Sequence, residues 1–388
     1  MTIGINGYEA VISRFGRDPK TGLPRRVGSG EYCFELLVNL NKIDKKNQYI
    51  IFLPKAPTVD LPNSSDNWHY KVIGPRRFWT LFALSIEFLF RRSRVDIFFS
   101  PAHYLPIFLP VKSAVSVLDI SYIHFPKLFK KKDLYQLKNW TAYSVKKASK
   151  VLTISHASKG DIIKTYGLPE SKVVVAYPGI REISNLKSQI SNMDKIKKKY
   201  GIEGDYILFV GTLQPRKNIV RLIQAFAELK TQNSKIKNKD IELIIVGKKG
   251  WLYEEILEAP KKFGIEDRVK FLDFVSDEDL PYFYKNAVCF VLPSLYEGFG
   301  LPVLEAMKYG CPVIASNVSS LPEAGGDAAL YINPLDVGDI AKNLELIIRS
   351  SELRKKLIEK GYHQVKKFSW EKTARETLKV LERVGNDK

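Results

Sequence analysis

Short apolar runs of strand length recur along the whole chain, and longer amphipathic segments separate several of them. In the first half the runs are Thr2–Asn6, Tyr49–Leu53, Tyr70–Ile73, Asp96–Ser100, Ala114–Leu118, Lys150–Ile154 and Val173–Ala176. In the second half they are Tyr206–Val210, Glu242–Val246, Val269–Leu272, Cys289–Leu292, Pro312–Ala315 and Ala329–Ile332. Runs that are apolar throughout are typical of parallel strands covered on both faces. The pattern therefore predicts an α/β protein with two doubly wound domains in series.

The segments between these runs predict the helices and the domain boundary. Gly30–Asn41, Asp133–Ser149 and Arg216–Lys230 have apolar residues at helical spacing. The lysine-rich stretch Pro178–Asp205 is polar and has little strand pattern, so we expect the boundary there. Ligands of open parallel sheets bind beyond the carboxyl ends of the strands, so two such domains facing each other predict a cleft between them.

Charge is spread unevenly along the 388 residues, which carry a formal net charge of +19. Residues 1–185 contain 28 Lys and Arg against 14 Asp and Glu, whereas residues 186–388 contain 33 against 28. General solubility is one explanation, and an anionic partner for the first half is another: nucleic acid, anionic lipid or a phosphorylated acceptor. No helix-turn-helix, zinc-finger or RNA-binding signature is present, so we do not expect nucleic acid as the partner.

The three cysteines and the N-terminus bear on the compartment. Cys33, Cys289 and Cys311 lie far apart without metal-ligand spacing, and the last two fall in apolar runs where they are expected to pack as small hydrophobic residues. No charged segment followed by an apolar one precedes the first strand. These features predict a protein of the reducing cytoplasm.

The most apolar helical stretch is "FWTLFALSIEFLF", Phe78–Phe90. It is too short to span a bilayer, and it contains Glu87. A buried or half-buried helix is one interpretation. The arginines on both sides of it favour the other, a helix at a membrane surface. These are Arg76, Arg77, Arg91, Arg92 and Arg94.

The most informative stretch is "PSLYEGFGLPVLEAMKYGCPVIAS", residues 293–316. It predicts a strand end, a glycine-rich loop with Glu297, a helix from Pro302 to about Tyr309, and a further strand. Gly298 and Gly300 permit close approach of a ligand, and free N–H groups at a helix start attract phosphate. An acid on each side of such a pocket, Glu297 and Glu305, would reach hydroxyls on both sides of a diphosphate, as in a nucleotide sugar. The alternative is a tight turn with an acid that the helix dipole favours.

A second stretch, "FVGTLQPRKNIVRLIQAF" at residues 209–226, places two cations at the start of a helix. Arg216 and Lys217 would match a diphosphate. Alone this pattern is common. Preceding the acid pair in the same predicted sheet, it favours a nucleotide-sugar site.

Together these motifs resemble the retaining glycosyltransferases of family 4, which have the GT-B fold. The resemblance rests on "EGFGLPVLEA" with its Glu-x₇-Glu spacing, "GTLQPRKN", "SSLPEAGGDAALYINPLD" and "FSWEKTARETL", and it is looser in the first half. It implies an N-terminal acceptor-binding domain at 1–185 and a nucleotide-sugar-binding domain at 186–368. It also implies a last helix, at 369–388, that crosses back to the first domain.

The resemblance implies a role for each matching residue in the second domain. Arg216 and Lys217 would hold the diphosphate and neutralise the leaving nucleoside diphosphate. Glu305 would bind the ribose, and Glu297 the transferred sugar. The other expected contacts are Gly211, which would keep its turn tight, Gly298, the backbone of Phe299, Gly300 and Leu301, and Phe274 and Val275 near the base. Such enzymes bind phosphate without a metal, and neither a metal-ligand cluster nor a cofactor is expected here.

In the first domain the resemblance implies that Gly28, Ser29 and Gly30 line the cleft. The family's His-Asp pair is only half present, because Asp119 matches while Leu118 stands where the histidine is expected. We predict that Asp119 lies in the active site, with capping of a following turn as its alternative role. His103 and His124 lie nearby in sequence and are candidate contacts to the sugar or the acceptor. The alternative is a structural role, which is more common for a lone histidine.

The predicted activity is transfer of a hexose, with retention, from GDP-mannose or a UDP-sugar to a glycan or lipid-linked acceptor, in surface polysaccharide assembly. Peripheral contact with anionic lipid at the inner face of the plasma membrane fits the basic first half. Leu118 motivates the alternative of an inactive nucleotide-sugar-binding subunit of a glycan-assembly complex. The Glu-x₇-Glu element argues against an epimerase or an inverting relative.

Overall fold

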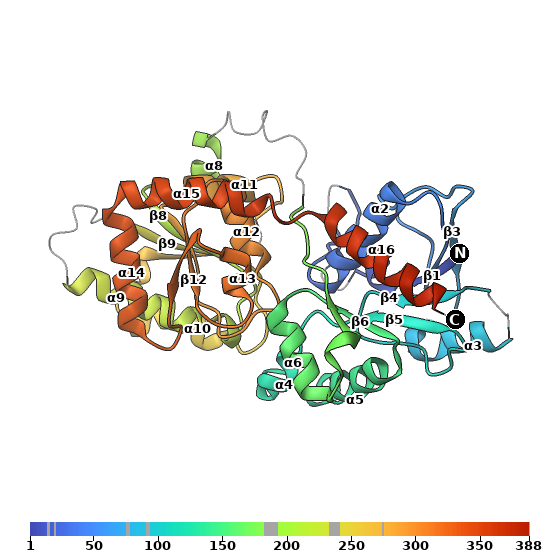
Figure 1. The fold of residues 1–388 in the computed structure, drawn as a ribbon. Helices are drawn as coiled ribbons and strands as arrows, with labels where there is room; N and C mark the ends of the chain where they lie inside the picture. The colour runs from blue at the N-terminus through green and yellow to red at the C-terminus, as the bar shows by residue number, and fades with distance from the viewer. Residues whose placement is uncertain are drawn as a thin grey trace. The chain divides into compact units, whose positions relative to one another are not determined.

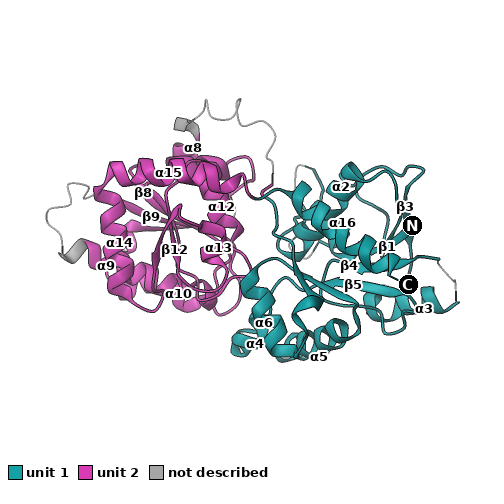
Figure 2. Ribbon diagram, in the orientation of Figure 1, with its two compact units in different colours: residues 1–179, 368–388 teal, residues 180–367 magenta. Residues whose placement is uncertain are grey.

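The computed structural model describes residues 1–13, 16–18, 21–74, 78–90, 94–181, 193–232, 241–273 and 275–387. They form two compact units, each built around one parallel sheet (Figures 1 and 2). Unit 1 comprises Met1–Gly179 and Phe368–Lys388, and unit 2 comprises Ile180–Lys367.

Unit 1 contains a seven-stranded sheet in the order β3-β2-β1-β4-β5-β6-β7. Its strands are β1 Thr2–Asn6, β2 Gln48–Leu53, β3 Trp68–Val72, β4 Ile97–Ser100, β5 Lys112–Ser116, β6 Lys150–Thr153 and β7 Val173–Val175. All neighbours pair in parallel, with Ile3 of β1 opposite Tyr49 of β2 and Ile97 of β4. The apolar runs of the first half are therefore parallel strands, as expected.

Helices cover both faces of this sheet. They are α1 Tyr8–Val11, α2 Ser29–Ile43, α3 Leu84–Phe90, α4 Ser121–His124, α5 Lys131–Lys147, α6 His156–Tyr166 and α16 Trp370–Asn386, with short turns η1 Trp79–Ala83, η2 Pro126–Leu128 and η3 Glu170–Lys172. One core contains Leu36 and Leu37 of α2 with Trp370 of α16, and the other contains Leu84 of α3 and Val145 of α5.

The last helix, α16, belongs to unit 1 although the chain reaches it from unit 2 (Figure 2). Ser369 caps its first turn by accepting a hydrogen bond from the Lys372 backbone N–H. The Thr373 hydroxyl donates to the Tyr177 carbonyl at 2.6 Å. The helix is strongly amphipathic, and its apolar side, which includes Ala374 and Leu381, is buried. Packing therefore ties the end of the chain to the first sheet.

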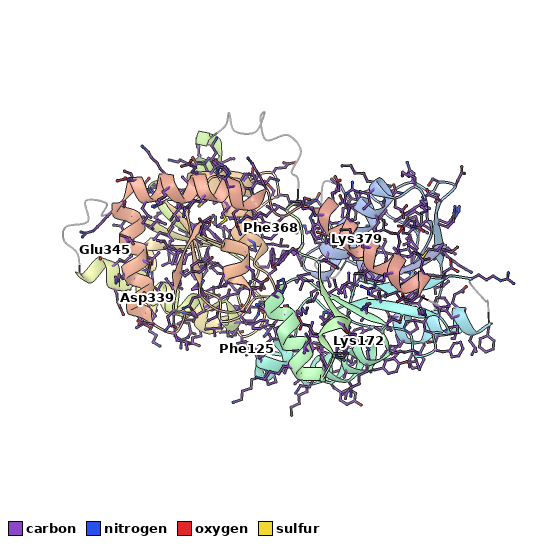
Figure 3. All side chains as sticks on the ribbon, viewed as in Figure 1. Phe125, Lys172, Asp339, Glu345, Phe368 and Lys379 are labelled. Carbon is purple, nitrogen blue, oxygen red and sulfur yellow. The ribbon has the colours of Figure 1, made fainter. Side chains whose placement is uncertain are left out.

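Side-chain contacts between successive elements fix the path of the chain in both units. In unit 1, Lys172, labelled in Figure 3, lies just before β7 and donates from Nζ to the Lys146 carbonyl at the end of α5. In unit 2, Asp339, labelled in Figure 3, lies in the first turn of α14 (Val337–Arg349) and accepts from the Asn333 backbone N–H at 2.7 Å. Such contacts hold loop ends next to the helices that they precede or follow.

Unit 2 contains a six-stranded parallel sheet in the order β10-β9-β8-β11-β12-β13. Its strands are β8 Tyr206–Val210, β9 Glu242–Val246, β10 Val269–Leu272, β11 Cys289–Leu292, β12 Val313–Ser316 and β13 Ala329–Ile332. Its helices are α8 Met193–Tyr200, α9 Ile219–Gln232, α10 Glu254–Lys262, α11 Leu280–Asn286, α12 Leu301–Lys308, α13 Leu321–Gly325, α14 Val337–Arg349 and α15 Ser351–Val365, with turns η5 Pro215–Lys217 and η6 Glu266–Arg268.

One predicted helix begins later than the apolar spacing indicates. The expected span was Arg216–Lys230, whereas α9 begins at Ile219. Arg216 and Lys217 lie instead in the η5 turn. Asn218, between this turn and α9, has a left-handed φ of 59°. A residue in that conformation interrupts the helix, so the two cations are held in a tight turn in front of it.

The apolar stretch Phe78–Phe90 forms a π-helical turn, η1, that continues into α3. One side of it is buried and the other is exposed. Of the arginines expected beside it, Arg76, Arg77, Arg91 and Arg92 lie outside the described residues. Among the described residues, no helix combines the length and apolarity needed to cross a membrane. Cys33, Cys289 and Cys311 are all buried as free thiols, as expected for Cys289 and Cys311.

Candidate active site

The strand order of unit 2 selects one crevice for ligand binding. The chain runs outward from β8 in one direction to β9 and β10 and in the other to β11, β12 and β13. Ligands of open parallel sheets bind where the order reverses, beyond the carboxyl ends of the two strands involved. Here those strands are β8 and β11. The loop after β8 carries Arg216 and Lys217, and the loop after β11 carries Glu297, so the topology brings the two predicted motifs together.

Glu297 is the centre of a hydrogen-bonded network between these loops. Lys217 donates from Nζ to its Oε1 at 2.5 Å, and Arg216 donates from Nη1 to its Oε2 at 3.0 Å. The Ser294 hydroxyl donates to the same Oε1 at 2.6 Å. The Glu297 side chain, at 10% exposure, and the flanking cations are nearly buried. Glu297, which is predicted to bind the sugar, therefore contacts Arg216 and Lys217, which are predicted to bind the diphosphate.

The charge state of Glu297 follows from these partners. Burial alone would raise the pKa of its carboxyl group. The charges of Lys217 and Arg216 and the hydrogen bonds from Lys217 and Ser294 outweigh burial and lower the pKa to about 2. Glu297 is therefore ionised at neutral pH. Two cations and one carboxylate leave one net positive charge at the end of β8 and β11.

The backbone around Glu297 is held by two serines that follow β12. The Ser319 hydroxyl accepts from the Glu297 backbone N–H at 3.0 Å, and the Ser320 hydroxyl donates to the Glu297 carbonyl at 2.8 Å. The sequence pattern predicts neither contact. "SSLPEA" is part of a motif that resembles the family, but spacing alone gives no partner for these hydroxyl groups.

The glycine-rich loop leads into α12 as the sequence predicts. Gly298, Phe299 and Gly300 are buried, and Leu301 is the first residue of α12. Gly300 has φ +104°, and a Cβ built on it would lie 2.6 Å from Leu321 Cδ2. Only glycine satisfies both conditions without strain. Pro302 lies in the first turn, and α12 ends with Gly310 one residue beyond its C-cap, as predicted.

Glu305 lies on α12, in a different environment from Glu297. It is half-buried, and its Oε2 accepts from the Tyr284 hydroxyl at 2.9 Å. Burial raises the pKa of Glu305, although the Tyr284 hydrogen bond acts in the opposite direction. Tyr309 stacks on Tyr284 with ring centroids 5.9 Å apart, so the tyrosine that donates to Glu305 is held by a second aromatic ring. The two glutamates of the motif thus have pKa values shifted in opposite directions.

Asn218 connects three loops at the same edge of the sheet, and the sequence analysis did not single it out. Its Nδ2 donates to the carbonyls of Pro293, after β11, and Pro334, after β13, at 3.0 and 2.6 Å. Its Oδ1 accepts from Arg221 at 2.8 Å. An asparagine directly after the two cations and just before a helix was the available signal, because asparagine tolerates a left-handed backbone.

The remaining predicted contacts of unit 2 lie at other strand ends. Gly211 directly follows β8, and a Cβ on Gly247, after β9, would lie 1.9 Å from the Gly211 carbonyl oxygen. The two glycines therefore allow the loops after β8 and β9 to touch. Val275 is buried, whereas Phe274 lies outside the described residues.

Gly28, Ser29 and Gly30 begin α2 in unit 1. Gly28 is the N-cap residue, with φ +56°, and Gly30 is buried. The Ser29 hydroxyl donates to Glu9 Oε2 at 3.1 Å, which holds the turn against α1. Arg26 fixes the same turn from the other side, because it donates to the Ala10 carbonyl at 2.7 Å.

The histidines and the aspartate predicted as contacts in unit 1 have different surroundings. Asp119 accepts at Oδ1 from the Ser121 backbone N–H at 2.8 Å, the contact expected of its alternative role at a following turn. His124 lies 3.2 Å from Asp161 on α6. His103 has a left-handed φ of 41°, and Leu118 is part of the buried core. Among the described residues, no group of three His, Cys, Asp or Glu is placed to hold a metal ion.

Two parallel sheets covered by helices, with a glycine-rich loop and two adjacent cations at the switch point of the second sheet, define the class of fold. A structure of Anabaena Alr3699/HepE in complex with UDP-glucose matches with a TM-score of 0.71 over 99% of this chain and 100% of that one, at 17% identity. The lipopolysaccharide glycosyltransferase WaaG matches with a TM-score of 0.69 over 98% and 99%, at 15% identity. The fold is GT-B, as the sequence predicted.

Sequence comparison gives the family. Residues 28–182 match "Glycosyltransferase Family 4" and residues 192–364 match "Glycosyl transferases group 1". The chain is 33% identical to the O-antigen chain mannosyltransferase B of Escherichia coli, over 80% of this chain and 78% of that protein. It is 30% identical to the E. coli serotype-specific mannosyltransferase WbdA, but it spans only 28% of that relative's length. The chain belongs to family 4 of the glycosyltransferases and is a retaining glycosyltransferase.

Proposed function

We propose that the protein transfers a mannosyl residue, with retention, from GDP-mannose to a glycan or lipid-linked acceptor in the assembly of a surface polysaccharide. The observation that carries the donor assignment is the network of Arg216, Lys217 and Glu297 at the switch point of unit 2. A sugar diphosphate needs cations for its phosphates and a carboxylate for its hydroxyl groups. The choice of mannose is supported by the relatives that are named mannosyltransferases.

In the proposed reaction the bond between the anomeric carbon and the diphosphate oxygen breaks, and a bond from that carbon to the acceptor oxygen forms on the same face. The acceptor proton passes to the departing phosphate oxygen. Arg216 and Lys217 stabilise the charge that develops on the leaving group, which is the main contribution to lowering the barrier. Glu297 holds hydroxyls of the sugar, and Glu305 holds those of the ribose.

The acceptor half of the proposal places the protein at the cytoplasmic face of a membrane. The excess of positive charge in residues 1–185 favours a lipid-linked acceptor in an anionic bilayer. In this proposal unit 1 contributes the acceptor contacts, with Asp119 as the active-site carboxylate, and unit 2 binds the nucleotide sugar.

The donor is tested with a thermal-shift screen of the purified chain against GDP, UDP, GDP-mannose and UDP-glucose. Ligands that bind the folded state raise the apparent Tm. We expect GDP and GDP-mannose to raise it and the uridine nucleotides to leave it unchanged. A rise with UDP-glucose alone would replace mannose as the donor sugar, and no rise with any of the four would overturn the site.

Turnover is tested by GDP release from GDP-mannose with α-methyl mannoside as a surrogate acceptor, and the anomeric configuration of the product is read by NMR. Arg216→Ala and Lys217→Ala should each lower the rate by about two decades, the scale for loss of a key electrostatic donor. Near-normal turnover of either variant would contradict the mechanism. Binding without turnover, for this acceptor and for a membrane extract rich in polysaccharide precursors, would identify an inactive binding subunit, the alternative that Leu118 raises.

A further inference from the structure

The helical segment made by η1 and α3 is apolar on the side that faces solvent as well as on its buried side. Its exposed residues include Phe82, Ile86, Leu89 and Phe90, whose spacing places them on one face of a helix. Phe90 is 73% exposed, and the other three are exposed by about half. Its buried side joins the core of unit 1 through Trp79, Leu84 and Phe88. A surface helix normally presents polar residues to water, so this segment is unusual.

The loop after β4 extends the exposed apolar surface. Ile107 and Phe108 are 48% and 41% exposed. The loop is anchored to α3, because the Phe108 backbone N–H donates to Ser85 Oγ at 3.0 Å. It is also anchored to α5, because the Tyr143 hydroxyl donates to the Ile107 carbonyl at 2.7 Å. We call the surface formed by Phe82, Ile86, Leu89, Phe90, Ile107 and Phe108 the apolar face.

The one acid of this segment points away from the apolar face. Glu87 is buried, and its Oε1 lies 2.6 Å from Lys71 Nζ. The negative charge of the helix is thus neutralised on the side that packs against the protein. A helix that used Glu87 for solubility would have presented it to water instead.

Positive charge borders the apolar face. Lys147 of α5 donates from Nζ to the Ile107 carbonyl at 2.7 Å, which fixes its ammonium group at the edge of the face. On α5 the exposed side chains include one acid, Asp133, and five lysines: Lys131, Lys132, Lys138, Lys146 and Lys147. Residues 78–147 contain eleven Lys and Arg against four Asp and Glu.

We propose that the apolar face is a docking site for a bilayer with anionic headgroups. Phe82, Leu89 and Phe90 enter the boundary between headgroups and acyl chains, and the lysines of α5 contact lipid phosphates. A bilayer supplies an apolar layer beside negative charge, which is the combination that this surface matches. The inference develops the membrane part of the proposed function, but it needs neither the donor nor the acceptor to be correct.

The first experiment is co-sedimentation of the full chain with vesicles, without nucleotide sugar. We expect binding to vesicles of equal amounts of phosphatidylglycerol and phosphatidylcholine, weak binding to phosphatidylcholine alone, and loss of binding as salt rises. The double variant Phe82→Ser/Leu89→Ser should bind about tenfold more weakly or worse, because the transfer of two apolar side chains is lost. Its control, Leu335→Ser/Leu346→Ser, removes two exposed leucines of unit 2 and should bind like wild type.

Charge is tested separately, with an unchanged apolar face. Lys138→Gln/Lys146→Gln should weaken binding to the anionic vesicles by about thirtyfold, since each lysine near such a surface contributes about 1 kcal/mol. The same variant should also reduce the salt dependence of binding. Lys342→Gln/Lys355→Gln, exposed lysines of unit 2, is the matched control. Equal effects of the two pairs would mean that total charge, rather than this surface, attracts the lipid, and would overturn the assignment.

Insertion is tested by Phe90→Trp with lipids brominated on their acyl chains. Quenching of the added tryptophan is expected, whereas Leu335→Trp should show none. Absence of vesicle binding by the wild type would overturn the proposal. Dimerisation that Phe82→Ser/Leu89→Ser abolishes, without vesicle binding, would assign the face to a second copy of the chain instead. Because no donor is present, failure here leaves the GDP-mannose tests intact, and failure of those tests leaves vesicle binding intact.

Discussion

Lys217 Nζ lies 2.5 Å from Oε1 of Glu297, so the cation expected to hold the diphosphate is paired with the carboxylate expected to hold the sugar. Both groups are nearly buried, and Arg216 contacts the other carboxylate oxygen. The pair couples the two halves of the proposed donor site. A change in one partner therefore alters the charge and the position of the other, and single substitutions report on both.

We predict that Lys217→Met destabilises the protein more than the double variant Lys217→Met/Glu297→Gln. The single change leaves a buried carboxylate that still accepts hydrogen bonds from Arg216 and Ser294 but has lost one of its two cations. Breaking a buried pair on one side costs about 3–5 kcal/mol, whereas replacing both partners is far milder. Scanning calorimetry should show a lower apparent Tm for the single variant. Transfer activity should be lost in both. Equal Tm values would mean that the pair is not coupled.

The low pKa of Glu297 predicts the direction of its acid sensitivity. The folded-state pKa of about 2 is below the usual 4.5, so the ionised carboxylate stabilises the fold fully above about pH 4.5. That contribution is lost as the pH falls from 4.5 through 2. Glu297→Gln should be less stable than wild type at pH 7, and the difference should shrink towards pH 2. Urea denaturation of both proteins across this pH range measures it, and a constant difference would contradict the assignment.

The sequence predicted the fold well because its signal was local and repeated. The spans Tyr206–Val210 and Glu242–Val246 were predicted to the residue, since buried parallel strands are apolar throughout. The contact between Lys217 and Glu297 could not be predicted in the same way. It depends on β8 lying beside β11, and the order of strands in a sheet is set by long-range packing rather than by local pattern.

Two further features, the start of α9 and the exposed side of α3, could not be predicted from the sequence. The start of α9 at Ile219 depends on the left-handed backbone of Asn218, and asparagine favours that conformation without requiring it. The outward side of α3 could not be identified, because its one acid, Glu87, is buried and its exposed side is apolar, so no polar face marks the solvent side. Only packing shows that Phe88 is buried while Phe90 is exposed.

We predict that Glu305→Gln weakens binding of GDP about tenfold or more, if its carboxylate accepts the ribose hydroxyls. A charged hydrogen bond contributes about 1.5–3 kcal/mol, and the amide retains only part of it. Tyr284→Phe removes the hydroxyl that orients Glu305 and should weaken binding by less. Isothermal titration calorimetry with GDP measures both. If neither variant changed the Kd for GDP, the assignment of Glu305 to the ribose hydroxyls would be wrong.

A control for these two variants is available in the same unit. Tyr331→Phe also removes a tyrosine hydroxyl, one that donates to the Gly326 carbonyl after α13. It should leave the affinity for GDP unchanged. A loss of affinity equal to that of Tyr284→Phe would show a general loosening of unit 2 rather than an effect through Glu305.

Asn218 is predicted to act as a positioning residue, because it ties the loops after β11 and β13 to the turn that holds the cations. Asn218→Gly keeps the left-handed backbone and removes the side-chain hydrogen bonds. We expect it to lower kcat more than it raises KM for the donor, with most of the stability retained. Asn218→Ala also strains the backbone, which should lower the free energy of unfolding by on the order of 1 kcal/mol and the apparent Tm with it. A normal kcat in Asn218→Gly would limit the role of the side chain to stability.

Gly300→Ala should inactivate the protein by disturbing the start of α12. An added Cβ would require an L-residue at φ +104° and would lie 2.6 Å from Leu321 Cδ2, so either the loop or α13 must move. The matched control is Gly160→Ala, in the middle of α6, where a Cβ meets nothing within 4 Å. The control should gain about 0.5–1 kcal/mol, as glycine-to-alanine changes inside helices do. Calorimetry and GDP titration of the two proteins separate these outcomes. If Gly300→Ala kept the wild-type affinity for GDP, the loop between Glu297 and α12 could not be the phosphate-binding element.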